Sequence, residues 1–351
     1  MGNHNGHLMK KDFHETQNPA VDTEEIWNRP DITLIDVRSP LEFDEGHISG
    51  AVNIPLLDNT ERKIVGILYK QYGHDKAVSR GYDILESKLS QLLQHFASVS
   101  KNHLTVVYCA RGGMRSQVIT SFLNDNAFNA KKLVGGYKSF RLWNINRLDN
   151  IKIEYPIILH GKTGVGKTLV LNEIENSLDL EGIAQHRGSL FGAVGKNPVS
   201  QKTFDVCLLN KLEELDLSRP VFIEGESRKI GNVMIPNNVF RQMKSGTSLL
   251  LEASIKTRVA RTIDEYIIDK ESYYPKIRDV IKLLERDLGN KNILNLLEQF
   301  DSGDYQSCFE YILLNYYDKK YGHSMKQLTF HETYSTENVK QTANKIQQYK
   351  I

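Results

Sequence analysis

The stretch that decides the fold of the first part of the chain reads Val106-Val107-Tyr108-Cys109-Ala110-Arg111-Gly112-Gly113-Met114-Arg115-Ser116. An apolar run delivers one cysteine into a glycine-containing loop, and the loop closes on an arginine. Tight loops of this kind turn successive backbone N–H groups toward one point, where a tetrahedral oxyanion can bind. The N–H groups, together with Arg111 and Arg115, favour the thiolate form of Cys109, which is the nucleophilic form. The predicted anion cradle consists of Gly112, Gly113 and Met114.

Segments on both sides of this loop alternate between strand and helix patterns. Residues 34–37, 104–108 and 132–134 are expected strands, and leucine spacing between residues 85 and 96 indicates helix. Residues 116–123 suit a helix whose N-terminus faces the cysteine loop. Such alternation predicts a parallel α/β sheet, in a first domain that spans residues 1–148.

A second α/β unit begins near residue 151. A strand at 155–159 runs into Gly161-Lys162-Thr163-Gly164-Val165-Gly166-Lys167-Thr168, which matches G-x-x-x-x-G-K-T and is followed by an expected helix at 169–178. This motif binds phosphate groups, because glycines allow close backbone approach, the lysine neutralises charge and the threonine can reach magnesium. The predicted phosphate-binding residues are Gly161, Gly164, Gly166, Lys167 and Thr168.

An acidic residue ends the next predicted strand, at residues 220–224. Glu224 is a candidate magnesium or charge partner of the phosphate loop, and the alternative is an acid that only faces solvent or caps a turn. Glu226 is less well placed by the motif. Helical spacing dominates residues 272–317. We therefore expect a second domain at 149–351, a P-loop NTPase-like α/β domain with a helical C-terminal portion.

Composition sets further bounds on the chain. Its 351 residues, 40% hydrophobic and 25% charged, suffice for two packed domains. The polar N-terminus carries no apolar signal core and no run reaches the roughly 18 apolar residues of a membrane span, so we expect a cytoplasmic protein without membrane partners. Cys109, Cys207 and Cys308 are widely separated and form no C-x-x-C spacing, which argues against a disulfide framework and a structural zinc site, and no metal site is certain.

A net charge of +2 does not by itself indicate a nucleic-acid binder, so clusters of basic residues matter more. From charge alone we favour solvated surfaces for both clusters. One cluster comprises Lys131, Lys132, Lys138, Arg141 and Arg147, and the other comprises Lys256, Arg258 and Arg261. Two further segments, 186–192 and 227–231, are either phosphate or base contacts or ordinary charged loops.

Cys109 has two alternative interpretations from the residues alone. Most intracellular cysteines are buried and structural, but the glycines and arginines that follow favour a reactive thiol. The spacing C-x-x-x-x-x-R to Arg115 also occurs in cysteine phosphatases, where the arginine clamps a phosphoryl group. Phosphatase chemistry therefore stays open at this point.

Several motifs resemble rhodanese domains. Asp36-Val37-Arg38-Ser39-Pro40, Glu42-Phe43, Gly46-His47-Ile48 and Gly50-Ala51-Val52-Asn53-Ile54-Pro55 look like the opening motif, and Leu133-Val134-Gly135-Gly136-Tyr137 looks like the closing one. The resemblance places Cys109 at the persulfide position and implies a rhodanese-like first domain, with its motifs from about residue 33. An insertion at about 57–82 is absent from plain rhodaneses.

The rhodanese motifs, the P-loop, residues 186–189 and residues 224–231 together resemble the tRNA 2-selenouridine synthase family. The resemblance implies a transferase acting at the tRNA anticodon, which geranylates wobble 2-thiouridine from geranyl diphosphate and then replaces the geranylthio group with selenium from selenophosphate. It implies catalytic roles for Cys109, Arg111 and Arg115, with Cys109 accepting selenium from selenophosphate. No tightly bound cofactor is expected, and magnesium is a candidate. The candidate tRNA contacts are His186, Arg187, Arg228, Lys138 and Arg141.

One departure from the family pattern follows the cysteine directly. Many members have tryptophan there, whereas this chain has Ala110, which puts base stacking at that point in doubt. We expect the P-loop to hold the diphosphate of geranyl diphosphate and the target base to be splayed out of the anticodon. The alternatives are a rhodanese-type sulfurtransferase fused to a nucleotide hydrolase, and a non-catalytic tRNA-binding module. A cysteine phosphatase ranks last, since it would use neither the rhodanese motif nor the P-loop.

Overall fold

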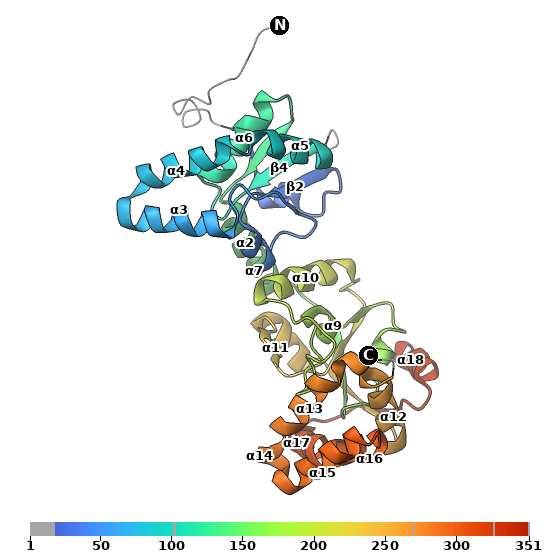
Figure 1. Cartoon of the computed structure of the whole chain (residues 1–351). Helices are drawn as coiled ribbons and strands as arrows, with labels where there is room; N and C mark the ends of the chain where they lie inside the picture. The colour runs from blue at the N-terminus through green and yellow to red at the C-terminus, as the bar shows by residue number, and fades with distance from the viewer. Residues whose placement is uncertain (1–17, 101–102, 269, 326, 350–351) are drawn as a thin grey trace. The chain divides into compact units, whose positions relative to one another are not determined.

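The computed structural model describes residues 18–100, 103–268, 270–325 and 327–349. The polar N-terminus, on which the expectation about targeting rests, lies outside these residues. The chain divides between Asn146 and Arg147 into two compact units. Each unit contains a parallel sheet with helices packed around it (Figure 1), which confirms the predicted α/β fold in both halves.

The first unit has a sheet with strand order β1-β5-β4-β2-β3, and its pairings are parallel. Its strands are β1 (Ala20–Val21), β2 (Ile32–Asp36), β3 (Val52–Asn53), β4 (Leu104–Tyr108) and β5 (Ala130–Leu133). Its helices are α1 (Thr23–Ile26), α2 (Pro40–Asp44), α3 (Asn59–Tyr72), α4 (His74–Glu86), α5 (Leu89–Val99), α6 (Met114–Asp125) and α7 (Gly136–Asn150).

The central strand β4 ends directly before Cys109, which thereby lies at the carboxyl end of the sheet. It occupies the predicted span 104–108, and its buried residues pack between β2 and β5. Parallel strands end at the same edge, so the segments that follow β2 and β4 come together there. The helix expected around residues 85–96 is instead two helices, because the chain bends at Ser87 and the Ser87 hydroxyl donates to the carbonyl of Ile84.

A buried ion pair joins the end of β2 to the rest of the first unit. The Arg38 guanidinium donates to both carboxylate oxygens of Asp36, and both side chains are almost fully buried. The guanidinium also lies 3.9 Å from the ring centroid of Tyr137 and donates to the carbonyl of Gly46 at 2.8 Å. The rhodanese-like opening motif is thus a structural clamp on strand β2 and helix α7.

The second unit has a parallel sheet of order β12-β11-β6-β8-β7. Its strands are β6 (Tyr155–Gly161), β7 (Ser177–Leu178), β8 (Pro220–Glu224), β11 (Thr247–Glu252) and β12 (Glu332–Ser335), with a separate antiparallel pair of β9 (Lys229–Ile230) and β10 (Val233–Met234). The helices that cover the sheet include α8 (Lys167–Leu171), α9 (Leu180–Ala184), α10 (Gln201–Glu214), α11 (Asn237–Ser245), α12 (Ile255–Tyr266) and α18 (Val339–Gln347).

The predicted helix at 169–178 is wrong in its second half. Helix α8 ends at Leu171, and residues 177–178 form strand β7 beside β8. The Ser177 hydroxyl donates to the carbonyls of Leu171 and Ile174 and thereby occupies helix-end acceptors. The apolar residues in this segment satisfy a strand and a helix equally well, so periodicity could not separate them.

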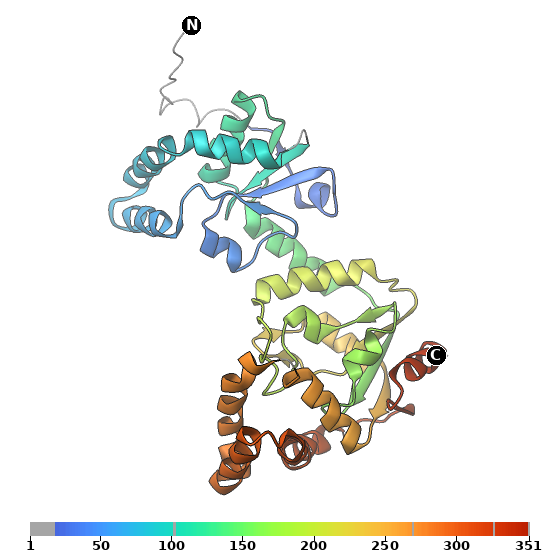
Figure 2. The same ribbon diagram turned by 45° about the vertical axis from the view of Figure 1, so that its right-hand side comes forward.

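The predicted helical region at 272–317 is confirmed. Its described helices gather on one side of the second unit, in orange in Figure 2, around a core that includes Ile281, Leu296 and Phe309. They are α13 (Tyr274–Leu283), α14 (Glu285–Leu288), α15 (Asn290–Asp301), α16 (Tyr305–Ile312), a π-helical turn at Leu313–Tyr317 and then α17 (Asp318–Met325). Among the described residues, none of the helices combines the length and apolar character that crossing a bilayer would require.

The Asp36–Arg38 pair gives a test of the first unit's stability. The Arg38→Met substitution leaves a buried carboxylate without its partner, so we expect a loss of about 3–5 kcal/mol in the free energy of unfolding. The measurement is urea unfolding followed by tryptophan fluorescence. Both tryptophans of the chain, Trp27 and Trp143, lie in the first unit, so the signal reports that unit alone.

The matched control is Arg29→Met, which breaks the exposed ion pair between Arg29 and Asp31. Solvent already screens that pair, so its loss leaves the urea midpoint unchanged. An Arg38→Met protein that unfolds at the wild-type midpoint would contradict the structural role of the clamp.

Candidate functional site

The cysteine loop connects strand β4 directly to helix α6. Cys109 follows the last residue of β4, and Gly113 is the N-cap of α6. Gly112 has a φ of +63°, a left-handed conformation that favours glycine. The backbone N–H groups at the start of α6 have no partners within the helix and carry the positive end of its dipole. The cradle predicted from Gly112, Gly113 and Met114 therefore lies at a helix start beside the cysteine.

Helix α7 supports this loop from behind. Tyr137 N–H donates to the Cys109 carbonyl at 2.9 Å, and Lys138 N–H donates to the Ala110 carbonyl at 3.0 Å. Gly136 has a φ of +59°, and a Cβ there would lie 2.3 Å from the Cys109 carbonyl oxygen. Only glycine allows α7 to begin this close, so the closing motif fixes the shape of the loop.

The surroundings of Cys109 favour its thiolate. Its side chain is 3% exposed, and its sulfur lies 3.3 Å from the Ser116 hydroxyl. Burial raises the pKa of this thiol, but the Ser116 hydroxyl, the Arg115 charge and the backbone N–H groups of Arg111 and Ser116 together lower the pKa below its ordinary value. The geometry agrees with a reactive cysteine and disagrees with a purely structural one. Ser116 contacts the sulfur, and the sequence reasoning did not single it out.

The two predicted arginines occupy different positions. Arg115 is half-buried and forms an ion pair with Glu42, with its Nη1 2.9 Å from Oε2. Burial raises the pKa of Glu42, but the hydrogen bond and charge of Arg115, the Ser39 N–H and the charge of Arg62 lower it overall. Arg111 is exposed beside the cysteine. Glu42, which belongs to the opening motif, therefore orients the arginine that the C-x-x-x-x-x-R spacing predicts.

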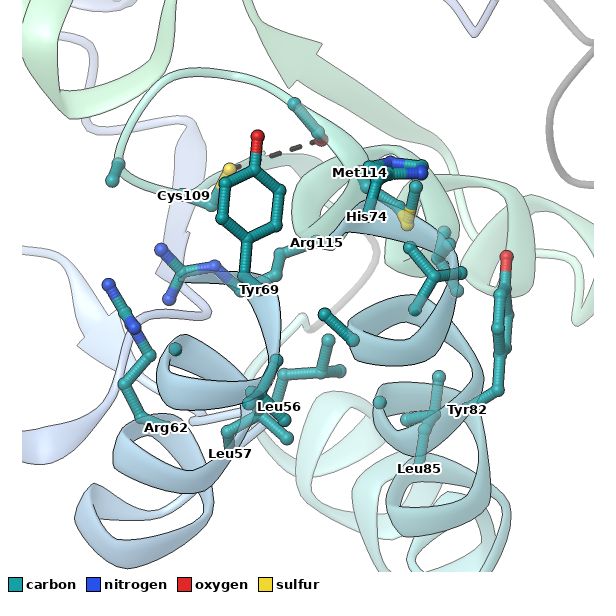
Figure 3. Close-up of a pocket in the computed structure, with 18 of the residues that line it drawn as sticks. Leu56, Leu57, Arg62, Tyr69, His74, Tyr82, Leu85, Cys109, Met114 and Arg115 are labelled. Atoms are coloured by element: carbon teal, nitrogen blue, oxygen red, sulfur yellow. Dashed lines mark hydrogen bonds between the residues drawn. The ribbon is translucent and has the colours of Figure 1, made fainter. Parts of the chain in front are cut away.

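A cavity of about 650 Å³ opens beside Cys109 within the first unit. Helices α3 and α4 form one side of it, and the cysteine loop with the start of α6 forms the other (Figure 3). Ala110, the departure from the family pattern, lines this cavity. The residues that line its apolar part include Leu56, Leu57, Val65, Val78, Leu85 and Met114.

The phosphate loop of the second unit has the backbone that its motif requires. Gly164 and Gly166 have φ values of +81° and +85°, and Lys167 begins helix α8 directly after them. A Cβ on Gly161 would lie 2.7 Å from the Leu251 carbonyl oxygen, so this glycine lets β6 end close against β11. The predicted phosphate-binding residues thus form one strand–loop–helix.

Buried carboxyl groups surround the lysine and threonine of this loop. The Thr168 hydroxyl donates to Glu224 Oε1 at 2.6 Å, and Glu224 Oε2 accepts from the Glu181 backbone N–H at 3.1 Å. Glu226, which the motif places less well than Glu224 as a magnesium partner, pairs with Lys167 across 3.7 Å. Its strand ends two residues earlier, and the following turn brings the side chain back to the loop. No sequence motif marks Glu181.

The carboxyl groups of this cluster have raised pKa values. Burial, with the charges of Glu224 and Glu226, raises the pKa of Glu181 to about 10. Burial, with the charge of Asp179, raises that of Glu224 to about 8, although Lys167 and Thr168 act in the opposite direction. Across the described residues, no set of three histidine, cysteine or acidic side chains is arranged to hold a metal ion by itself. A cation at Thr168 and Glu224 would therefore need oxygen ligands from a bound phosphate as well.

Two arginines of the second basic cluster hold the phosphate loop in shape, contrary to the expectation of a solvated surface. Arg258 is 3% exposed, donates to the Thr163 carbonyl at 2.9 Å and forms an ion pair with Asp318. Arg261 donates to the Val165 carbonyl at 2.6 Å. Charge spacing alone could not show this, because the loop carbonyls that these arginines bind lie more than 90 residues earlier in the sequence.

The candidate tRNA contacts have varied surroundings. Arg187 forms an ion pair with Glu265, donates to the Val194 carbonyl at 2.7 Å and lies over the Tyr266 ring, so internal contacts occupy it. His186 packs beside Gly192 and Gly231, and burial with the Arg187 charge lowers its pKa. In contrast, Arg228 and Lys138 are exposed, and Arg141 lies one turn after Lys138 on α7.

The contact between Ser116 and Cys109 gives a test of the electrostatics. We expect Ser116→Ala to raise the pKa of the Cys109 thiol, so that reaction with iodoacetamide sets in at higher pH than in the unsubstituted protein. A Cys207→Ser background removes the exposed thiol, and burial raises the pKa of Cys308 to about 12, so that group stays protonated. Ser121→Ala, on the same helix, serves as the control. An unchanged pH profile in Ser116→Ala would contradict the role of the hydroxyl.

Comparison with known proteins relates both units to characterised families. A family model described as the tRNA 2-selenouridine synthase AAA domain matches residues 154–350, and a rhodanese-like domain model matches residues 20–142. A tRNA 2-selenouridine synthase from Nitrosomonas eutropha is 38% identical, over 72% of this chain and 68% of its own length. One from Hydrogenovibrio crunogenus is 33% identical, over 84% of this chain and 90% of its own length. With one model matching more than half of the chain and these relatives matching across both units, the chain belongs to the tRNA 2-selenouridine synthase family.

Proposed function

We propose that this protein converts wobble 2-thiouridine in tRNA to 2-selenouridine in two steps, by S-geranylation from geranyl diphosphate and then exchange of the geranylthio group for selenium from selenophosphate. The family membership supports selenouridine synthesis on tRNA as the overall activity. The observation that carries the two-step form is that one chain contains both a thiolate-favouring cysteine in an anion cradle and a complete diphosphate loop. Each of the two steps thereby has a separate loop whose residues fit its chemistry.

The first step uses the phosphate loop of the second unit. The thiocarbonyl sulfur of the base attacks C1 of the geranyl group, the C1–O bond breaks, diphosphate departs and N3 loses its proton. The loop amides and Lys167 stabilise the charge that develops on the leaving diphosphate. Magnesium fits the paired oxygens of Thr168 and Glu224, and when bound it supplies further positive charge to that group. An ion pair with Glu226 positions the Lys167 side chain at the loop.

The second step uses the cysteine loop of the first unit. Selenium of selenophosphate adds to C2 while N3 takes up a proton, and the C2–S bond then breaks to release geranylthiol, with that proton passing from N3 to sulfur. The base then carries a selenium-bound phosphoryl group. The Cys109 thiolate attacks that phosphorus, the P–Se bond breaks, N3 regains a proton and 2-selenouridine is released. Water finally cleaves the phosphoryl-cysteine to phosphate, and no oxidant or reductant is needed.

This role for Cys109 differs from the selenium acceptance that the resemblance to tRNA 2-selenouridine synthases implies. Selenium in selenophosphate is already fully reduced, so forming a cysteine perselenide from it would require a two-electron oxidation. Attack on phosphorus requires none. A cysteine thiolate with an arginine six residues later and amides around it suits a phosphoryl group well.

The tRNA must present the base to both loops. C2 is inaccessible in a stacked anticodon, so the base is splayed out to react. Lys138 and Arg141 lie on α7, whose first turn supports the cysteine loop, and they suit contacts with the RNA backbone near that site. Arg228 suits such a contact in the second unit, whereas Arg187 acts within the fold.

Lys167→Ala separates the two steps. We expect geranylation to fall at least about a hundredfold, because the leaving diphosphate loses its main cation. Selenation of RNA that already carries S-geranyl-2-thiouridine stays within about twofold, since the cysteine site is intact. Mass spectrometry of nucleosides measures both products. The exposed Lys282→Ala is the control, and retention of geranylation in Lys167→Ala would overturn the assignment of the phosphate loop.

Cys109→Ser gives the complementary result. The base that carries the selenium-bound phosphoryl group accumulates and 2-selenouridine does not form, because that phosphoryl group has no thiolate to accept it. With selenophosphate labelled in both phosphorus and selenium, rapid acid quenching of the wild type recovers phosphorus label on Cys109. Selenium label on Cys109 without phosphorus label would instead support a perselenide and contradict phosphoryl transfer.

A further inference from the structure

The cavity beside Cys109 has a largely apolar lining, and the cysteine loop does not need such a lining to bind a phosphate group. We propose that this cavity binds the ten-carbon isoprenoid chain of the S-geranylated base and so selects that base for the selenium step. The inference rests on the proposed function, because it identifies the subsite for the group that the second step expels. The volume of the cavity, about 650 Å³, lies within the range of pockets that enclose small organic ligands.

The lining of the cavity is apolar at one end and cationic near the cysteine. Leu56, Leu57 and Leu85 lie together away from the sulfur, and Arg115 lies beside it (Figure 3). Arg62, Lys70 and Arg111 also line the cavity. An apolar chain joined to a polar, phosphate-bearing centre matches this distribution. Selenophosphate or phosphate alone would leave the apolar part unused.

The apolar wall comes largely from helices α3 and α4, which carry the insertion predicted at about 57–82. Helices α3 and α4 pack side by side (Figure 1) and contribute Val65, Val78 and Tyr82 to the lining. The Asp58 side chain caps the start of α3 at the backbone N–H of Glu61, and Lys88 pairs with Glu61 beyond the end of α4. These contacts hold the pair in place although its lining face stays open. A pair of helices that closed only to fill a core would have no such opening toward the nucleophile.

The position of the cavity favours the geranylated base over geranyl diphosphate as the source of the chain. Cys109 lines the cavity, so a chain bound there would hold C2 beside the cysteine loop when selenophosphate adds to it. Geranyl diphosphate would bring a diphosphate to this site, whereas the motif that matches a diphosphate lies in the second unit. The bound chain would also displace water from around the reacting atoms.

The test measures protection of Cys109 from iodoacetamide in the full-length Cys207→Ser protein, so it requires no turnover. The probes are an anticodon stem-loop with S-geranyl-2-thiouridine, the same stem-loop with S-methyl-2-thiouridine, and geranyl diphosphate. We expect the S-geranyl stem-loop to protect at concentrations at least about tenfold lower than the S-methyl stem-loop, since most of the chain is removed from water. Geranyl diphosphate gives no protection at those concentrations.

Filling the cavity should remove this preference. Gly81 lines the cavity from within α4, and a Cβ there meets no atom within 4 Å, so Gly81→Trp places a ring in the open space. Val65→Phe fills the cavity from α3, and it provides the same test if Gly81→Trp does not fold. Both should bring the S-geranyl stem-loop to the level of the S-methyl one. Ile67→Trp, on an exposed position of α3 outside the lining, is the matched control and keeps the preference.

The outcomes separate this inference from the proposed function. Equal protection by both stem-loops in the wild type, or an unchanged preference in both filled variants, overturns the subsite. Protection by geranyl diphosphate but not by the S-geranyl stem-loop overturns the assignment to the base. If the preference holds and the filled variants lose it, the subsite is supported even where 2-selenouridine fails to form, and that failure then counts against the proposed function alone.

Discussion

The close backbone contact between Cys109 and the start of α7 determines the first site. Gly136 allows α7 to begin within van der Waals reach of the cysteine carbonyl, and Tyr137 and Lys138 then donate to the carbonyls of Cys109 and Ala110. With these carbonyls held from behind, the N–H groups of the loop can face the opposite side. The same helix contributes Tyr137 to the buried clamp of Asp36 and Arg38. One packing constraint therefore connects the opening motif, the cysteine loop and the closing motif.

The phosphate loop of the second unit is also held by its backbone carbonyls, but side chains and not backbone N–H groups bind them. This loop also lies where a parallel strand ends and a helix begins, which is the usual ligand position in open α/β sheets. Here side chains hold the loop carbonyls, with Arg258 on Thr163 and Arg261 on Val165. Asp318, from the helical C-terminal portion, pairs with Arg258 and Lys162. The C-terminal helices are thus part of the support of the phosphate site, because they carry a carboxylate that orients its arginine.

Local sequence patterns predicted the parts of both sites that depend on neighbouring residues. Strand β4, the cysteine loop, the phosphate loop and strand β8 follow from apolar runs and glycines that are contiguous in sequence. The parts that were missed depend on contacts between distant segments. Arg258 binds a carbonyl 95 residues away, and Glu226 meets Lys167 only after the chain turns back. The cavity needs α3, α4 and α6 together, so no single segment could indicate it.

The two proposed steps place opposed demands on their surroundings, which explains why one site would serve both of them poorly. A leaving diphosphate requires concentrated positive charge, and Lys167 with the loop amides supplies it among carboxyl groups that could hold a cation. A thiolate that attacks phosphorus reacts best when little water surrounds it, yet burial alone raises its pKa and removes the charge. Cys109 resolves this conflict because Ser116, Arg115 and the backbone N–H groups outweigh the effect of burial. Glu42 pairs with Arg115 and thereby orients this cation beside the apolar cavity.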